Sequence, residues 1–500
     1  MTKRIMVQAH SQYRGLQLAL IERFTERENS QIVIYCANEQ EKTYWGRSAG
    51  DSVDIIVNST LYEVARLLVE DEKALMKRAR RYEVDYGLTI NGLAVSDRHL
   101  GRGYALGGYK HPRSQISEST SYAQMVAAFV SEFEFWIKEF DDRSPTLVIG
   151  YNKVQALIAR HRGIPFRLLT GARYKSYYQW FQNEFFENPL VEEVYRSIDD
   201  TGPDDSETIA APYKAHMDIR ANFDKSMRLS RLLKESLLIV LRFVYWKVRR
   251  YEKARGYLLS DRLAYPWRRR IDTKLLTGGI SKPLSDLKDQ KFIYYPLHTE
   301  PEAALQGLSP EYFYQLSCIA ALSRDLPAGT LLAVKETFQA TGRRPSDFYM
   351  QIAEFKNVVI LDMMELGPDV IAACNAVATI TGTAGLEGAV MGKPVITFGQ
   401  HNIYNFLGHV SVVTEEAQLR DFLANALSDN FDTDSALREG QRFLKALVSC
   451  SFDLQGYNIT KPETVTAEHG DAVYDALLAS LRESDGNAQE IEMTAAAEPS

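Results

Sequence analysis

The chain has 500 residues, a formal net charge of −7 and 45% apolar residues. This is the composition of a folded protein long enough for more than one domain. The acidic balance argues against a general electrostatic attraction to nucleic acid, so no nucleic-acid partner is expected. The four cysteines lie far apart and form no CxxC pair, which argues against zinc ribbons and redox dithiols. No apolar signal sequence opens the chain, and no stretch approaches the ~20 apolar residues of a membrane span. We therefore expect a cytoplasmic protein.

The first 200 residues alternate between apolar, β-branched runs and segments with one apolar face. This alternation predicts a parallel sheet covered by helices, that is, a Rossmann-like domain. The expected strands are 3–9, 31–36, 52–57, 145–150 and 164–169. An irregular, glycine- and aromatic-rich stretch at 86–113 interrupts the pattern. A long loop inside a compact domain is usually functional, so we expect functional residues there.

Residues 201–290 differ from the rest because they are rich in arginine, lysine and helix-forming residues. The run 237–246 is almost continuously apolar, although basic residues flank and interrupt it. One interpretation is a helical insert between two domains, with one face buried. The other is a helix that lies on a membrane surface through residues 228–270, with its basic residues on anionic lipid. The second interpretation predicts peripheral contact with the inner face of a bacterial inner membrane.

A second alternation of strands and helices begins at residue 291 and is the clearest pattern in the chain. Its short loops predict a complete doubly wound domain. The expected strands are 291–298, 330–335, 358–361, 376–381 and 395–398. The expected divisions of the whole chain are an amino-terminal domain 1–200, an insert 201–290, a second domain 291–430, carboxyl-terminal helices 431–484 and a disordered tail 485–500.

Polar residues follow the expected strands of this second domain where each strand ends. His298 follows the first strand, and Lys335 and Glu336 close the second. Ligands of doubly wound sheets bind outside the carboxyl ends of the strands, so these side chains are expected to converge on one edge. There His298 and Lys335 would offer donors or positive charge to a phosphate.

A turn of small residues follows the fourth of these strands and opens a helix. The turn consists of Gly382, Thr383, Ala384 and Gly385. Free backbone N–H groups and the positive end of a helix dipole would meet there, which is a site for a phosphate. Glu387, about one turn into the helix, would reach a sugar hydroxyl beside that phosphate. An ordinary βαβ unit, with glycines that serve only tight packing, is the competing interpretation.

Two Rossmann-like domains that face a cleft form the GT-B architecture of glycosyltransferases. In this arrangement one domain holds a nucleotide-activated sugar and the other offers the acceptor. No DxD motif stands between the strands, and a helix N-terminus with basic side chains can neutralise the leaving phosphate. We therefore expect neither a metal nor a cofactor other than the nucleotide sugar itself.

Three segments of the second domain, PLHTEPEAAL (296–305), AVKE (333–336) and ITGTAGLEGAVMGKPVITFG (380–399), carry a family pattern. In order and spacing they resemble the bacterial capsule polysaccharide biosynthesis and export proteins, which include the capsular Kdo transferases. The resemblance spans residues 291–413. It implies a GT-B transferase that moves a sugar from CMP-Kdo or another nucleotide sugar to a capsular-type polysaccharide or its lipid-linked acceptor.

One position departs from the family pattern. Thr337 and Phe338 follow Lys335 and Glu336, where the family has His-Pro. Because that histidine would be a natural donor to a phosphate, its absence leaves open a different donor or a lost activity. A catalytically inactive assembly or export partner is therefore an alternative function. A nucleotide-sugar 2-epimerase, which has the same two-domain fold and a similar glycine-rich turn, is another.

Transfer to an acceptor hydroxyl with inversion needs a general base near that hydroxyl. We expect it in the amino-terminal domain, with Asp97 as the first choice and His10, at the end of the first strand, as the second. Arg98 and Arg102, in the same irregular stretch as Asp97, are the expected contacts to an anionic acceptor. For Asp97 the competing interpretation is a carboxylate that caps its own loop or pairs with an arginine.

Overall fold

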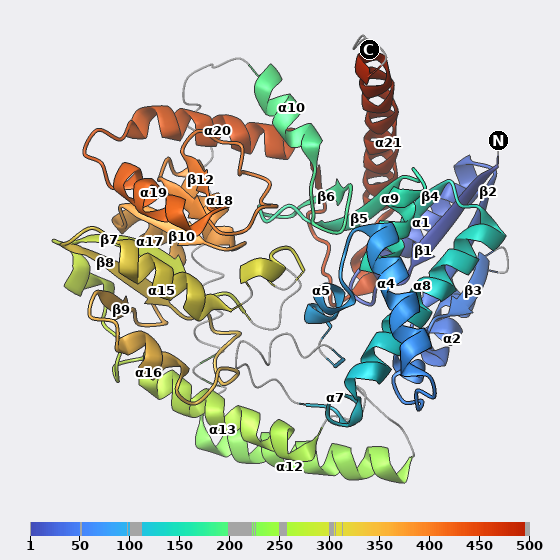
Figure 1. The fold of residues 1–500 in the computed structure, drawn as a ribbon, viewed down its shortest axis with the longest axis horizontal. Coiled ribbons are helices and arrows are strands. Elements are labelled where there is room, and N and C mark those ends of the chain that lie inside the picture. The colour runs from blue at the N-terminus through green and yellow to red at the C-terminus, as the bar shows by residue number, and fades with distance from the viewer. Residues whose placement is uncertain are drawn as a thin grey trace. The chain divides into compact units, whose positions relative to one another are not determined.

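The computed structural model describes residues 2–50, 53–97, 99–100, 113–198, 223, 225, 227–249, 258–299, 305, 307–312 and 314–495. The chain divides into two compact units, each with its own sheet flanked by helices (Figure 1). Unit 1 comprises Met1–Ile90, Tyr122–Val194 and Lys445–Ser500, and unit 2 comprises Asn91–Ser121 and Tyr195–Leu444. The prediction of an α/β protein with two Rossmann-like units is confirmed.

Unit 1 is built on a sheet that has seven strands within the described residues, in the order β13-β6-β5-β4-β1-β2-β3. The strands are β1 (Lys3–Gln8), β2 (Ser30–Cys36), β3 (Val53–Val57), β4 (Leu147–Ile149), β5 (Phe166–Gly171), β6 (Tyr177–Phe181) and β13 (Phe452–Asp453). Strands β1 to β5 pair in parallel, whereas β6 and β13 add an antiparallel edge. The chain fills one side of the sheet with β1 to β3 and the other from β4 onward. The strand order therefore reverses between β1 and β4.

The helices of unit 1 cover this sheet. They are α1 (Arg14–Arg27), α2 (Glu39–Ser48), α3 (Thr60–Val64), α4 (Glu72–Tyr86), α8 (Tyr122–Arg143), α9 (Lys153–His161) and α21 (Ala467–Ala495), while α5 (Ile90–Val95) and α10 (Pro189–Ser197) lie at its boundaries. The long α8 is aromatic, as its sequence predicts, and buries Phe133 and Trp136. A single periodic segment at 61–84 forms two helices, α3 and α4, because Asp71 caps a new helix by accepting from the N–H of Ala74.

The carboxyl-terminal segment returns to unit 1, which corrects the expected separate group of helices at 431–484. Strand β13 pairs with β6, and α21 packs beside α1 (Figure 1). Arg23 of α1 pairs with Asp471 at 2.7 Å, and the Tyr474 hydroxyl donates to Glu28 at 2.7 Å. Residues 485–495, expected to be disordered, continue α21. Their alanines, glutamates, glutamine and methionine are helix formers, so the local sequence permits this.

Unit 2 is built on a sheet that has six parallel strands within the described residues, in the order β12-β11-β10-β7-β8-β9. The strands are β7 (Lys291–Pro296), β8 (Thr330–Lys335), β9 (Val358–Ile360), β10 (Ala376–Thr379), β11 (Val395–Thr397) and β12 (Val410–Val412). Successive residues of β7 enter different apolar clusters, Ile293 and Tyr295 in one and Phe292 and Tyr294 in the other. The sheet therefore buries both faces, as a doubly wound sheet must.

The helices of unit 2 complete the doubly wound pattern and add the insert. They are α7 (Gln115–Ser119), α12 (Leu229–Val248), α13 (Leu259–Leu276), α15 (Gln315–Asp325), α16 (Phe348–Ala353), α17 (Gly367–Ala373), α18 (Thr383–Val390), α19 (Leu419–Ala426) and α20 (Thr433–Ser449), the last of which crosses into unit 1. The insert does form helices, α12 and α13, and these pack against each other.

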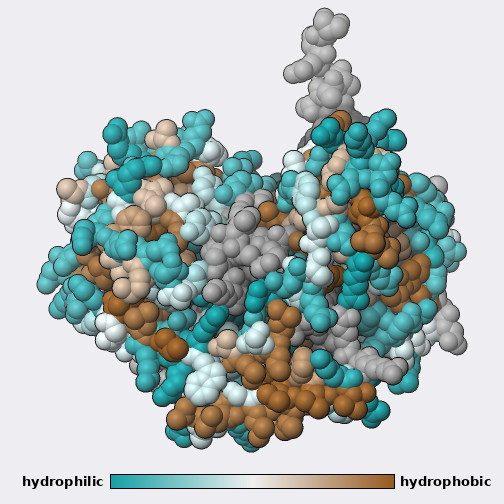
Figure 2. Space-filling model, turned by 60° about the horizontal axis from the view of Figure 1, so that its bottom comes forward, coloured by the Kyte–Doolittle hydropathy of each residue, from teal (hydrophilic) through white to brown (hydrophobic). Residues whose placement is uncertain are grey.

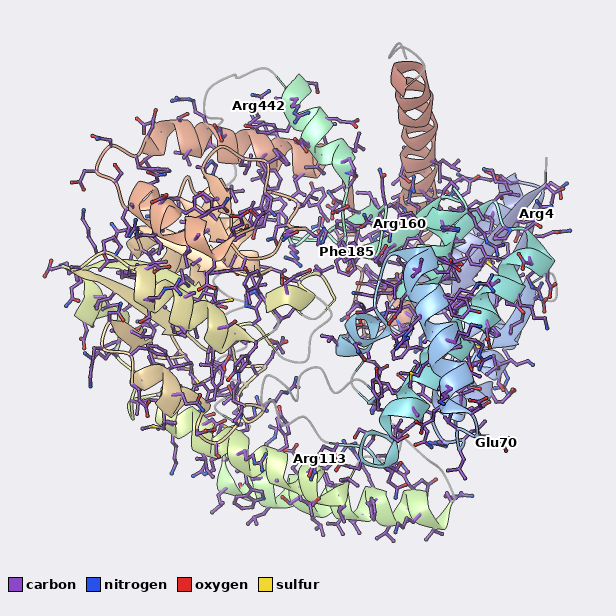
Figure 3. All side chains as sticks on the ribbon, in the orientation of Figure 1. Arg4, Glu70, Arg113, Arg160, Phe185 and Arg442 are labelled. Carbon is purple, nitrogen blue, oxygen red and sulfur yellow. The ribbon has the colours of Figure 1, made fainter. Side chains whose placement is uncertain are left out.

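Residues 91–121, expected in the amino-terminal domain, belong to unit 2. Arg113, labelled in Figure 3, explains part of this assignment. Its Nε donates to Asp261 of α13 at 2.9 Å, and its carbonyl accepts from the N–H of Leu258 at 2.7 Å. Contacts between residues distant in sequence thus override the boundary that composition suggests at residue 200.

Candidate functional site

The strand order of unit 2 locates the site before any side chain is considered. The order reverses between β7 and β10, and ligands of open α/β sheets bind at such a switch point, outside the carboxyl ends of the strands. The segments that follow these two strands carry His298 on one side and the Gly382 turn on the other. The structure thus brings together two features that lie about 80 positions apart in sequence.

His298 holds the Gly382 turn in place through hydrogen bonds. Its Nε2 accepts the N–H of Thr381 at 3.0 Å, lies 3.3 Å from the Thr379 hydroxyl, and the residue is only 6% exposed. An imidazole that accepts a hydrogen bond at Nε2 carries its proton on Nδ1 and is neutral. We therefore correct the prediction that His298 offers positive charge to a phosphate, since this ring holds the Gly382 turn in place.

The turn leads directly into α18, which begins at Thr383, so most of the expected turn is already helical. Gly382 is the N-cap residue, and its N–H donates to the Thr379 hydroxyl at 3.0 Å, while the N–H of Gly385 donates back to the Gly382 carbonyl at 3.2 Å. Within the described part of the chain, the backbone N–H groups of Thr383 and Ala384 have no hydrogen-bond acceptor. These two donors, at the positive end of the helix dipole, are what remains for an anion.

Two glycines allow the backbone to run this close to its neighbours. A Cβ at Gly382 would lie 2.7 Å from the Thr379 hydroxyl and 3.2 Å from His298 Nε2. A Cβ at Gly385 would lie 2.7 Å from the Thr379 methyl and would clash with the Tyr404 hydroxyl. Both positions therefore require glycine because of close packing, and in the cap and first turn of α18 only Gly382 and Thr383 are not buried.

Lys335 and Glu387 form the charged part of the site. Lys335 ends β8, beside β7, and Glu387 lies one turn into α18, with each side chain only partly exposed. Burial lowers the pKa of Lys335, and the carboxylates of Glu336, Glu365 and Glu387 oppose that effect. Burial raises the pKa of Glu387 to about 7, and the Lys335 ammonium opposes this rise. The two predicted residues are thus electrostatic neighbours at the same edge of the sheet.

Glu336 does not share this role, which corrects the prediction that it contacts a donor. Its side chain is fully buried and pairs with the equally buried Arg344 at 2.8 Å. The Tyr349 hydroxyl and the N–H of Thr337 also donate to it, each at 2.8 Å. A carboxylate saturated in this way organises the loop after β8, because a buried charge must be paired and hydrogen-bonded.

Arg344 is the residue that sequence reasoning missed. Its guanidinium spans Glu336 and the backbone carbonyl of His298, the latter at 2.5 Å, and so ties the loop after β8 to the segment after β7. In sequence it is one of two adjacent arginines after a glycine, a pattern that resembles any solvated basic loop. A signal was nevertheless present, since an isolated acidic residue at the end of a buried strand needs a cationic partner.

The departure at Thr337 and Phe338 has a packing explanation. Phe338 lies 4.9 Å, ring to ring, from Phe223 and packs against the main apolar cluster of unit 2. The Arg269 guanidinium of α13 also lies over the Phe223 ring, 4.7 Å from its centroid. The side chain that replaces the family's proline therefore attaches the loop to the insert.

Unit 1 has a corresponding edge at its own switch point, between β1 and β4. His10 follows β1, and its ring lies 4.9 Å from that of Tyr13 and 4.3 Å from that of Tyr151, which follows β4. Tyr178 and Tyr457 extend this group of rings. Burial lowers the pKa of His10 to about 4, and its Nδ1 has no hydrogen-bond partner among the described residues. The ring is thus a neutral imidazole beside an aromatic surface.

Asp97 is less suited to act as a base. Its Oδ1 accepts the N–H groups of His99 at 2.8 Å and Leu100 at 2.7 Å, which makes it a loop-capping carboxylate. It also belongs to unit 2, whereas we expected the base in the amino-terminal domain. Arg98 and Arg102, the predicted acceptor contacts, lie outside the described residues. Across the described residues, no group of three or more His, Cys, Asp or Glu side chains is arranged to hold a metal ion.

Sequence comparison places this site within a known family pattern. Residues 207–438 match the profile of the family described as "Capsule polysaccharide biosynthesis protein". This segment resembles that family. The resemblance predicted for residues 291–413 is therefore confirmed, and it extends through α12 and α13 to the end of the unit 2 sheet. In contrast, no curated protein matches the chain in sequence.

Several solved structures show a distant likeness. KpsC from Thermosulfurimonas dismutans, described as a beta Kdo 2,4 transferase, is 12% identical, with 60% of this chain and 80% of that chain covered and a TM-score of 0.30. Anabaena HepE in complex with UDP-glucose is 10% identical, with 95% of this chain and 99% of that chain covered and a TM-score of 0.31. The UDP-GlcNAc 2-epimerase of Methanocaldococcus jannaschii is 12% identical, with 90% of this chain and 100% of that chain covered and a TM-score of 0.25. Likenesses this distant carry no argument, and the fold rests on the two sheets described above.

Proposed function

We propose that this chain is a glycosyltransferase that moves a sugar from a nucleotide-activated donor to a capsular-type polysaccharide or its lipid-linked acceptor. One observation carries the proposal. Within the segment that resembles the capsule polysaccharide biosynthesis family, the open N–H groups of Thr383 and Ala384 lie at the switch point, on the same sheet edge as Lys335 and Glu387. This combination suits a phosphate with an adjoining sugar.

In this proposal each residue of the unit 2 edge has a defined role. The amino end of α18 binds the phosphate of the donor and stabilises the charge that develops when the sugar leaves. Lys335 adds a cation to that stabilisation, without a metal ion or other cofactor. Glu387, with a pKa of about 7, hydrogen-bonds a hydroxyl of the donor. CMP-Kdo is one candidate donor, and the altered loop at Thr337 and Phe338 leaves room for another nucleotide sugar.

We place the acceptor at the aromatic edge of unit 1. Tyrosine rings offer flat apolar surfaces to sugar rings and hydroxyls to their polar groups. His10, a neutral imidazole beside these rings, is preferred as the general base over Asp97, whose Oδ1 already accepts two backbone N–H groups. The reaction takes place in the cytoplasm, where nucleotide-activated sugars serve as donors.

Ligand-dependent melting of the full chain tests the donor site. CMP, UDP, GDP and dTDP are added separately, and the matching nucleotide is expected to raise the melting temperature by about 5 °C at saturation. Lys335→Ala and Glu387→Ala should each lose most of that shift. Lys356→Ala is the matched control, since this exposed lysine precedes β9 at the opposite end of the strands. If none of the four nucleotides raises the melting temperature, the proposal is contradicted.

Incubation with a nucleotide sugar separates transfer from the alternatives. A transferase leaves the donor sugar unchanged in the absence of acceptor and adds it to an acceptor glycan in its presence. Epimerisation without acceptor would instead establish the 2-epimerase alternative. Glycan synthesis in cells that is unaffected by Lys335→Ala or Glu387→Ala would favour an inactive assembly partner.

A further inference from the structure

Helix α12 exposes an apolar stripe along its whole length. The stripe consists of Leu229, Leu233, Leu237, Leu241, Val244 and Val248, each more than half exposed. Their spacing of three and four residues places all six on one helical face. Figure 2 shows apolar side chains gathered in a band at the foot of the molecule, where Figure 1 places α12 and α13. Contiguous apolar surface of this kind is rare on monomeric soluble proteins and marks an interaction site.

The stripe is not the face that packs on α13. The inward face of α12 carries Leu232, which is fully buried, and Ser236, whose hydroxyl accepts from the Trp267 indole N–H at 3.2 Å. Helix α13 is in turn anchored to unit 2, because Asp272 accepts the N–H of Gly342 at 3.0 Å and Leu276 enters the unit 2 core. The helix pair is therefore fixed through one side, and the apolar stripe is left on another.

Two of the basic residues of α12 border the stripe. From Leu229 to Arg249 the chain carries five basic residues and one acidic residue, Glu235, in a protein whose net charge is −7. Lys234 and Lys247 flank the stripe on its two sides by helical phase, and both are exposed. Trp267 and Ile271 of α13 are also exposed apolar residues. An apolar stripe with cationic borders and aromatic residues fits the boundary between lipid tails and anionic headgroups.

We propose that α12 and α13 form a membrane-docking surface that lies flat on an anionic lipid bilayer, with the apolar stripe of α12 among the acyl chains. A 20-residue helix is about 30 Å long, so the stripe is straight and extended, as contact with a plane requires. A second copy of the chain suits this surface less well. A twofold interface would oppose two identical sets of basic residues, which is unfavourable.

This surface differs from a membrane span. Nowhere in the described part of the chain is a helix long and apolar enough to cross a bilayer. The proposal therefore predicts reversible binding that depends on both apolar contact and charge. It does not depend on the proposed transferase activity, because none of its residues belongs to the donor site.

Co-sedimentation of the full chain with lipid vesicles tests the proposal. The vesicles contain phosphatidylcholine alone or phosphatidylcholine with an equal part of phosphatidylglycerol. The protein is expected to sediment with the anionic vesicles, and much less with the neutral ones. Binding should weaken between about 0.1 M and about 1 M salt, because salt screens the contribution of the basic residues. Equal sedimentation with neutral and anionic vesicles would overturn the assignment of an anionic surface.

A double variant, Leu237→Glu with Leu241→Glu, removes the centre of the stripe. We expect it to lower the affinity for anionic vesicles more than about tenfold. Two leucines that would enter the acyl chains are lost, and two negative charges that the anionic lipid repels are introduced. Its melting temperature should match that of the wild type, because both side chains are exposed. The matched control is Leu68→Glu with Val84→Glu, which alters two apolar residues of unit 1 that are even more exposed.

Two results would overturn the proposal. One is the absence of vesicle binding, or binding that the stripe variant leaves unchanged. The other is a concentration-dependent dimer in sedimentation equilibrium that the stripe variant dissociates, without lipid binding, which would assign the stripe to a second copy of the chain. Lys234→Glu with Lys247→Glu adds a further check, because it should weaken anionic binding and leave any residual neutral binding unchanged.

Discussion

Glu387 and Glu336 show how environment separates two carboxylates of one sheet edge. Glu336 is saturated by Arg344, Tyr349 and a backbone N–H and serves only to hold the loop after β8. Glu387 is partly buried, has no such hydrogen-bond partners among the described residues, and has its pKa raised to about 7. Strained or uncompensated groups of this kind concentrate at functional sites. The contrast favours Glu387 as the residue that meets a ligand.

The raised pKa of Glu387 gives a first prediction. Because the folded protein holds this proton up to about pH 7 while the unfolded chain releases it near its ordinary pKa, the carboxylate lowers stability as pH rises through that window. Glu387→Gln should therefore melt at a higher temperature than the wild type at about pH 8, and at nearly the same temperature at about pH 4.

Melting curves of both proteins across this pH range measure the effect. Glu354→Gln, directly after α16, is a control in the same unit, because this carboxylate is exposed and has no side-chain partner among the described residues. A Glu387→Gln protein that is less stable than the wild type at high pH would show that the carboxylate is stabilised in the fold. That result would contradict the assignment of Glu387 as a site residue whose charge is not compensated by the fold.

Among the elements, α18 with the turn before it is the most constrained. The N–H groups of Thr383 and Ala384 at its amino end are placed by His298, which holds the turn, and by two glycines that let the backbone approach Thr379 and Tyr404. The helix has eight residues and little stability of its own, since short helices are marginal in water. Its position therefore depends on packing, and the anion site depends on that position.

Close packing of α18 gives a second prediction. Gly385→Ala introduces a Cβ that clashes with the Tyr404 hydroxyl and crowds the Thr379 methyl, so unfolding should become easier by about 1–3 kcal/mol. Tyr404→Phe removes the hydroxyl, and the double variant should recover part of the loss. Denaturant unfolding of the four proteins measures the coupling.

Gly367→Ala supplies the control for this experiment. This glycine begins α17, a Cβ there meets nothing within 4 Å, and alanine is the better helix former. Its stability should be unchanged or slightly higher. If Gly385→Ala lowers the free energy of unfolding equally with and without the Tyr404 hydroxyl, the close contact with Tyr404 is not the reason that this position requires glycine.

At the level of the whole chain, the carboxyl-terminal segment is the least local feature. Residues after Leu444 leave unit 2, add β13 to the edge of the unit 1 sheet and place α21 on α1. Val473, Tyr474 and Leu477 of α21 are buried with the strands that open the chain. Unit 1 therefore cannot complete its core until the last segment has been synthesised.

This topology gives a third prediction. A chain that ends at Leu444 should fail to fold unit 1, because it lacks β13 and the apolar face of α21, while unit 2 retains all its strands. Amide exchange should then be fast in β1 and β2 and slow in β7 and β8. Truncation after Ser484 is the control, since it keeps the buried residues of α21. Protected β1 and β2 amides in the shorter chain would contradict this account.

Sequence periodicity alone predicted the parallel strands of the two sheets. The strands around Ile5, Ile34, Ile293 and Val377 have short apolar centres, as strands buried on both faces should. The rule that ligands bind at carboxyl strand ends also selected the edge that carries Lys335, the Gly382 turn and Glu387. The outcome follows because these features depend on neighbours close in sequence.

Tertiary structure alone decided the rest. It showed that His298 is a neutral support, that Glu336 is buried against Arg344, and that Asp97 caps a loop in unit 2. It also returned α21 to unit 1 and left the stripe of α12 exposed. Each of these depends on which distant residues meet, and a side chain of given chemistry takes its charge state, its burial and its role from those partners.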